Sequence, residues 1–182
     1  MTRWVLTLGF LLALTACSNG GGTLEPVLEP GGEIAGFGDF SNGADKSFGI
    51  FICTRGGAVT VESIDVISIE GDIDLLGASI YTSSERFVGA VHGYPPAGID
   101  ETKLQDLEGA VVEADCEGPE GDDRVQLVVG AERAGRGGGQ IDGLTVGTDA
   151  GEVEINFAIV LCGDELEYCE ALLGTEDDGG DE

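Results

Sequence analysis

The stretch Glu152-Val-Glu-Ile-Asn-Phe-Ala-Ile-Val-Leu161 is the strongest indication of the fold class, because its apolar residues recur at every second position. The residues of this apolar face are Val153, Ile155, Phe157, Ile159 and Leu161. Polar side chains at Glu152, Glu154 and Asn156 fall on the opposite face. A period of two with one apolar face predicts a half-buried strand of an antiparallel sheet.

Similar apolar runs occur along much of the chain, at 59–69, 73–81, 86–92, 107–116, 125–131 and 141–147. In the run 59–69 the alternation changes phase twice, after Val61 and after Val66, which indicates a bulge or a strand break. Many short strands separated by Gly- and Asp-rich turns predict an all-β fold. We expect an immunoglobulin-like antiparallel β-sandwich with one or two short helices.

Two segments carry the signals of a short helix. Asp100 is placed to cap a helix over 101–108 that would turn Leu104 and Leu107 inward. Asp164 is placed to cap a second helix over 165–173.

The charge balance excludes one large class of partner. The 182 residues include 8 Lys and Arg against 35 Asp and Glu, a formal net charge of −27. Binding of nucleic acid phosphates requires clustered cationic side chains, so we expect no nucleic acid partner. A hydrophobic content of 42% is too high for a wholly disordered acidic chain.

The N-terminus has the pattern of an export signal. Arg3 precedes an apolar run from Trp4 to Leu14, which is shorter than the roughly 20 residues of a membrane-spanning helix. The run ends in Leu14-Thr15-Ala16-Cys17, which resembles the lipobox of bacterial lipoproteins. This resemblance implies cleavage before Cys17, a diacylglyceryl thioether on Cys17, and a lipid anchor at the extracytoplasmic face of the cell membrane. Two acyl chains meet the requirement for stable anchoring.

These features divide the chain into four parts. We expect a lipoprotein signal peptide over 1–16, and a lipidated Cys17 followed by a flexible Gly- and Pro-rich tether over 17–33. A single β-sandwich domain is predicted over 34–174. The tail 175–182 contains five acids and no apolar side chain, and is predicted to be disordered.

Four cysteines remain once Cys17 is assigned to lipidation: Cys53, Cys116, Cys162 and Cys169. An even number in an exported protein predicts two disulfides. The strand positions favour Cys116–Cys162 with Cys53–Cys169, and the alternative of Cys53–Cys116 with Cys162–Cys169 stays open. A zinc site is not expected, because the spacings lack a close ligand pair.

No catalytic constellation emerges from the motifs. His92 is the only histidine, and no Gly-x-Ser-x-Gly elbow accompanies it. The Gly-rich stretch 135–140 lacks the Lys-Ser/Thr ending of a phosphate loop and is predicted to be a hairpin loop. The acidic cluster Glu117–Asp123 does not match a calcium loop. We therefore predict neither a catalytic residue nor a cofactor or metal.

The functional hypothesis is a binding module. In general layout the mature domain resembles uncharacterised exported lipoproteins of actinobacteria. We expect a non-catalytic interaction module of the cell envelope, held to the membrane by the lipid on Cys17. The candidate contact for an envelope protein partner is the loop that contains His92, Tyr94, Pro95 and Pro96, in which the tyrosine and the two prolines offer rigid apolar area. The alternatives are a calcium-binding module and a secreted hydrolase that uses acidic residues.

Overall fold

The computed structural model describes residues 21–27, 34–37, 45–83, 90–116 and 124–163. Its strands are β1 Thr23–Pro26, β2 Ile34–Phe37, β3 Asp45–Arg55, β4 Val59–Gly71, β5 Ile73–Ser83, β6 Ala90–His92, β7 Leu104–Asp106, β8 Val111–Val112, β9 Arg124–Arg133, β10 Gly138–Thr148 and β11 Gly151–Cys162. A 3₁₀ turn, η1, covers Glu101–Lys103. The all-β prediction is confirmed.

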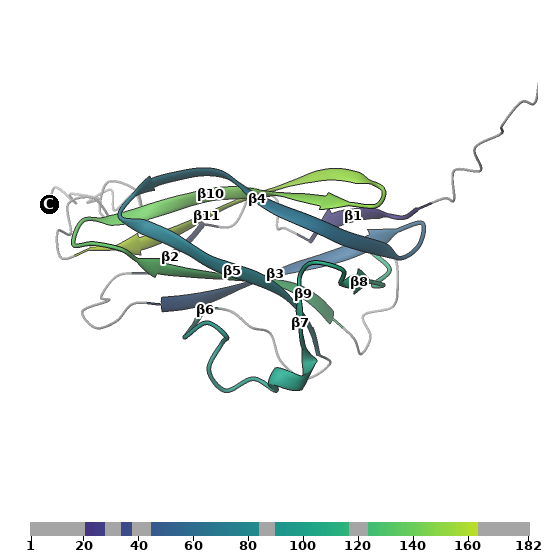
Figure 1. Cartoon of the computed structure of the whole chain (residues 1–182), viewed down its shortest axis with the longest axis horizontal. Helices are drawn as coiled ribbons and strands as arrows, with labels where there is room; N and C mark the ends of the chain where they lie inside the picture. Colours follow the sequence, from purple (N-terminus) through teal and green to yellow (C-terminus); the bar gives the residue numbers. More distant parts are fainter. Residues whose placement is uncertain (1–20, 28–33, 38–44, 84–89, 117–123, 164–182) are drawn as a thin grey trace, which may run out of the picture.

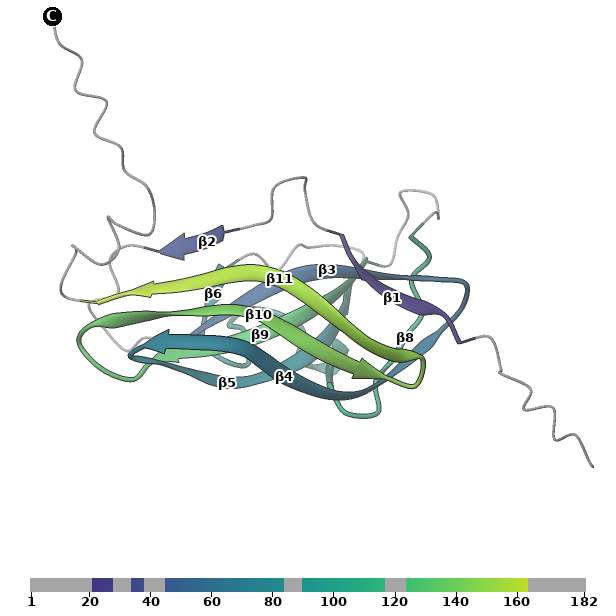
Figure 2. The ribbon, with the colours of Figure 1, turned by 90° about the horizontal axis from the view of Figure 1, so that it is seen from above.

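The strands form two packed sheets (Figures 1 and 2). The first sheet has the order β1-β3-β9-β5-β7, and β6 pairs with β3 beyond the end of β1. The second has the order β2-β11-β10-β4-β8. Pairing is antiparallel apart from β2, which runs parallel to β11. The architecture is a β-sandwich, and the narrower immunoglobulin-like assignment stays a prediction.

The core lies between the two sheets and follows the predicted alternation. On β11, Ile155, Ile159 and Leu161 are at most 1% exposed. Phe48 and Ile50 of β3 belong to the same apolar cluster from the opposite sheet. Burying side chains of this size stabilises the fold by roughly 1.5–3 kcal/mol each.

Of the two phase changes predicted in the run 59–69, the first is a bulge within the continuous strand β4, whereas at the second β4 stays in register with β10 from Ser63 to Gly71. Val61 pairs with Thr148 but Ser63 pairs with Gly147, so Glu62 is an extra residue in a bulge. Farther along, Val66 pairs with Leu144 whereas Ile69 pairs with Ile141. Both of these β10 partners are fully buried, and Gly143 between them has a φ of +61°. The positive φ of this glycine lets β10 change the positions that face the core.

The predicted helix over 101–108 is wrong in length. Asp100 does cap it, since its carboxylate accepts from the Thr102 backbone N–H at 3.1 Å. The helix ends after the single turn η1, because Leu104 begins β7 and pairs with Tyr81 of β5. Leu107, by contrast, is buried as expected. The second predicted helix, 165–173, lies outside the described residues, as does the tail 175–182.

The predicted boundary between tether and domain is also wrong. Thr23–Pro26 forms β1, which pairs with β3 from Arg55 to Ile52. Leu24 is 2% exposed and belongs to the core cluster. Part of the expected tether is therefore a strand of the sandwich, because an apolar residue at this position gains more by packing on the core than by remaining in water.

The Gly-rich stretch 135–140 is not a hairpin loop. It leaves β9 in the first sheet and enters β10 in the second. The Asp72 carboxylate accepts from the Gly137 backbone N–H at 3.2 Å, and a Cβ at Gly135 would lie 2.3 Å from Asp72 Oδ2. These glycines let the chain pass close to the β4–β5 turn as it crosses between the sheets.

Candidate functional site

The predicted contact loop belongs to a longer segment, residues 90–106, that crosses the outer face of the first sheet. We call it the covering segment. It starts with β6 on β3, runs through η1, and ends with β7 on β5. β6 and β7 are edge strands of this sheet, and Figure 1 shows the loop and η1 between them on the far side of the sheet from β10 and β11. The sequence predicted the loop but not that it crosses the outer face of this sheet.

A small second apolar cluster holds the covering segment in place. Tyr81 of β5 and Val128 of β9 are 4% and 0% exposed, although both face away from the main core. The residues of the covering segment packed on them are Val91, Tyr94, Ile99 and Leu104. The covering segment therefore buries apolar surface that an ordinary two-layer sandwich would expose.

Tyr94 occupies a slot made by two glycines. A Cβ at Gly130 would lie 2.3 Å from Tyr94 Cγ, and a Cβ at Gly77 would lie 3.2 Å from Tyr94 Cε1. The Tyr94 hydroxyl is 2.9 Å from Ser79 Oγ. The two glycines remove the side chains that would block the ring, so Tyr94 serves to anchor the segment to the sheet.

Backbone contacts next to Tyr94 fix the start of the loop. The Tyr94 N–H donates to Asp45 Oδ2 at 3.2 Å, and the Gly93 N–H donates to the Asp45 carbonyl at 3.1 Å. Ser47 Oγ donates to the Gly93 carbonyl at 2.5 Å. These bonds satisfy backbone groups that would otherwise be unpaired in a packed loop. The Tyr94–Pro95 peptide is cis.

Lys46 is an unexpected neighbour of His92. It is 5% exposed and continues the period-two face of Phe48 and Ile50 into the end of the core. Its Nζ lies 2.9 Å from His92 Nε2 and closer to Nδ1, and the ammonium can donate only to the ring nitrogen that carries no hydrogen. Burial lowers the pKa of Lys46, and the nearby Asp45 carboxylate opposes that shift. The ring nitrogens of His92 thus contact a lysine, and the hydroxyl of the neighbouring Ser47 is bonded to a carbonyl.

The four residues predicted to contact a partner differ in their exposure to solvent. His92 and Pro95 are exposed, Tyr94 is half-buried, and Pro96 is buried. The exposed surface of the loop is completed by Ala97, whose N–H donates to the His92 carbonyl at 2.9 Å. Tyr94 and Pro96 therefore contribute to holding the loop, and the area open to a partner is smaller than the sequence suggested.

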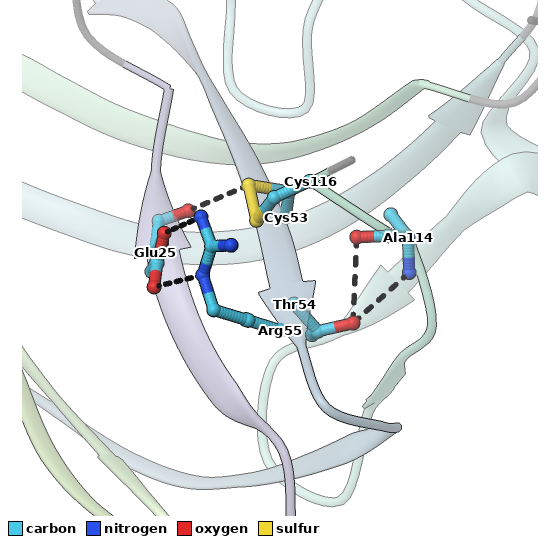
Figure 3. Close-up of a disulfide and its surroundings, with 6 residues drawn as sticks. All are labelled: Glu25, Cys53, Thr54, Arg55, Ala114 and Cys116. Carbon is cyan, nitrogen blue, oxygen red and sulfur yellow. Dashed lines mark hydrogen bonds and ion pairs between the residues drawn. A yellow bond between two sulfur atoms is a disulfide. The ribbon is translucent and has the colours of Figure 1, made fainter. Parts of the chain in front are cut away.

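A disulfide joins Cys53 of β3 to Cys116, at a Cα–Cα distance of 5.0 Å (Figure 3). The Thr54 N–H donates to the Ala114 carbonyl at 2.6 Å, and the Cys116 N–H donates to the Thr54 carbonyl at 3.1 Å. This short pairing with the segment after β8 brings the two sulfur atoms together. The predicted bonds Cys116–Cys162 and Cys53–Cys169 are therefore wrong, and the Cys53–Cys116 bond of the alternative is confirmed. Cys162 is also disulfide-bonded, with neither of these cysteines as its partner. Cys169 and Cys17 lie outside the described residues.

An ion pair lies beside the disulfide. Arg55 Nε and Nη2 donate to the two oxygens of Glu25 at 3.0 and 3.2 Å (Figure 3). This hydrogen bonding lowers the pKa of Glu25. Because both side chains are well exposed, solvent screens the pair, and its effect is mainly to align β1 with β3.

Three further findings bear on function: a search for metal sites, a search for membrane-spanning helices, and the comparison with known proteins. In the described ranges, no three or more His, Cys, Asp or Glu side chains lie close enough together to hold a metal ion. The acidic cluster Glu117–Asp123 is outside those ranges. Among the same residues, no helix has the length and apolar character needed to span a membrane. No protein-family model, curated protein or solved structure matches this chain.

Sequence reasoning missed the residues that hold the loop from below, above all Lys46, Ser47 and Gly130. A signal for Lys46 was present, because it keeps the period of Phe48 and Ile50. For Gly130 the sequence showed a glycine inside an apolar strand, which is typical of a close approach by another group.

Proposed function

We propose that this protein is a lipid-anchored, extracytoplasmic binding module that recognises another component of the cell envelope without catalysing a reaction. The observation that carries the proposal is the Cys53–Cys116 disulfide, in a chain whose residues Leu14-Thr15-Ala16-Cys17 resemble a lipobox. Disulfides of this kind form in oxidising compartments. The disulfide and the lipobox resemblance support the same location by independent chemistry.

The fold adds support to a binding role. The covering segment is held by Tyr94 from within, and it presents His92, Pro95 and Ala97 on its outer side. A rigid loop on a stable sheet loses little conformational entropy when it binds a partner. This arrangement favours recognition by a preformed surface.

The anchor is tested by mass spectrometry and fractionation of the full-length protein. We expect a diacylglyceryl mass on Cys17 and retention in the membrane fraction after a high-salt wash. A Cys17→Ala variant should lose both properties. An unmodified Cys17 in the wild-type protein, or its release by salt, would contradict lipid anchoring.

The binding role is tested by in-cell cross-linking followed by mass spectrometry of the captured proteins. The test variant is Ala97→Glu, and its matched control is Ala150→Glu in the exposed β10–β11 turn. Neither change touches a side chain that holds the fold. We expect a dominant partner that is lost with Ala97→Glu and kept with Ala150→Glu. Capture that is unchanged in both variants would remove this loop from the proposal.

A further inference from the structure

The outer edge of β4 is open over most of its length. On one side β4 pairs with β10 from Val61 to Gly71. On the other side, among the described residues, β8 pairs only with Val59 and Thr60. The section from Glu62 to Glu70, which we call the open edge, therefore has no neighbouring strand in the described part of the chain. An open strand edge offers a row of backbone donors and acceptors to an extended chain.

The side chains of the open edge are unusual for a surface strand. Ile67 and Ile69 are 45% and 46% exposed and stand two positions apart. Leu76, on the following strand β5, is a further exposed large apolar residue. Proteins commonly protect free edges with charge and keep isoleucine away from them. Two exposed isoleucines on an open edge fit a strand-addition site that also contacts apolar side chains of its partner.

The charge around these isoleucines has one sign. Between residues 62 and 76 the chain contains five acids and neither Lys nor Arg. Glu62, Asp65 and Glu70 are exposed on β4, and Asp74 is exposed on β5. Surfaces of one sign attract partners of the opposite sign and repel their own kind.

The negative charge favours one of three candidate strands for the open edge. The candidates are a second copy of this chain, its own C-terminal stretch and a segment of a partner protein. A second copy would bring acids against acids, which is unfavourable for strands that pair directly. The C-terminal stretch 175–182 carries five acids and would be repelled in the same way. A partner segment that carries both cationic and apolar residues would pair its backbone with β4, its apolar side chains with the isoleucines and its cations with the acids beside them.

We propose that the open edge of β4 binds an extended cationic segment of a partner protein by strand addition. The inference rests on the proposed binding role and gives it a surface and a partner chemistry, but it does not depend on the lipid anchor. Because the attraction is partly between exposed charges, binding should weaken as salt shortens the screening length to about 8 Å at physiological ionic strength.

The experiment uses the full-length protein in detergent and a labelled peptide of alternating Lys and Val. Controls are a peptide of the same composition with its Lys and Val in two blocks, and an alternating peptide of Glu and Val. We expect fluorescence anisotropy to show binding of the Lys–Val peptide, at least tenfold tighter than either control and weakened by salt. Hydrogen exchange should show new amide protection within 62–70.

The test variant carries both Ile67→Lys and Ile69→Lys. These two changes place cations on the open edge, where they would repel a cationic peptide. Its control is Val27→Lys. Val27 is 54% exposed and directly follows β1, an edge strand of the other sheet. Binding should fall at least tenfold in the double variant and stay within twofold in the control. Circular dichroism and urea unfolding would verify that both variants are folded.

Several outcomes would overturn the inference. These are equal binding of the alternating and blocked Lys peptides, no binding of the alternating peptide, or protection outside 62–70. A concentration-dependent dimer with protection at 62–70 would assign the edge to a second copy. If cross-linking depends on Ala97 while the peptide fails, the open-edge inference is wrong and the proposed function stands.

Discussion

The outer faces of the two sheets differ in character around Val128 of the first sheet and Thr145 of the second. The first sheet carries Val128 and Tyr81 on its outer face, and the covering segment buries both. Across the second sheet, Asp65, Thr145 and Glu154 are register neighbours on the outer face, and we call them the polar row. Where a strand is apolar or small on both faces, its outer face is covered, as it is also at Val160 and Cys162 of β11; where polar residues alternate with apolar ones, the outer face is polar.

The largest expected loss of stability comes from removing the Cys53–Cys116 disulfide. The change is Cys53→Ala together with Cys116→Ala, which opens a bond between residues 63 apart. We expect a loss of about 4 kcal/mol in the free energy of unfolding, because the unfolded chain regains the entropy of a long loop. Urea unfolding measures it, and reduction of the wild-type protein provides a comparison. A loss below about 1 kcal/mol would show that the disulfide contributes little to the stability of the fold.

A smaller effect is expected from filling the slot beneath Tyr94. Gly130→Ala places a Cβ 2.3 Å from Tyr94 Cγ, so the ring must move, and we expect a loss of about 1–3 kcal/mol. The matched change outside the covered face is Gly147→Ala, where the new Cβ would lie 2.4 Å from Ser63 Oγ. Since that hydroxyl can rotate away, the expected loss is below about 0.5 kcal/mol. Urea unfolding measures both losses in the free energy of unfolding. Equal losses in the two variants would contradict the claim that the first sheet is closely covered at Gly130.

The hydroxyl of Tyr94 should contribute less than its ring. Tyr94→Phe removes the 2.9 Å hydrogen bond to Ser79 and leaves the ring in its slot. The expected loss is about 1 kcal/mol, measured by thermal and urea unfolding. Thr145→Val in the polar row is the control and should change stability by less than about 0.5 kcal/mol. A double-mutant cycle with Ser79→Ala would isolate the bond, and a coupling near zero would show that the hydroxyl is not used.

The smallest expected effect concerns the charge of the polar row. At a net charge of −27 the acidic side chains of one folded molecule repel one another, which lowers its stability. Salt screens this repulsion, so the melting temperature should rise as salt increases toward physiological ionic strength. Glu154→Gln should raise the melting temperature slightly at low salt, and that advantage should disappear as salt is added. A melting temperature that is flat or falls with salt in the wild-type protein would contradict this expectation.

Much of the fold was predictable from local pattern. The alternation in 152–161 identified the core face of β11, and the first of the two phase changes in 59–69 located a real bulge in β4. Asp100 was correctly predicted as a cap. The helix length was wrong because the pairing of Leu104 with Tyr81 of a distant strand decided it.

The sequence by itself determined the all-β class, the core-facing residues and the negative surface, because each follows from side-chain period or from composition. Only the tertiary structure decided that Cys53 lies beside Cys116, that Gly130 receives Tyr94, and that the glycines at 135–140 cross between sheets. These are contacts between residues far apart in the chain. A local pattern shows that a residue is buried or that a turn is needed, but the partner is chosen by how the two sheets and their cover pack together.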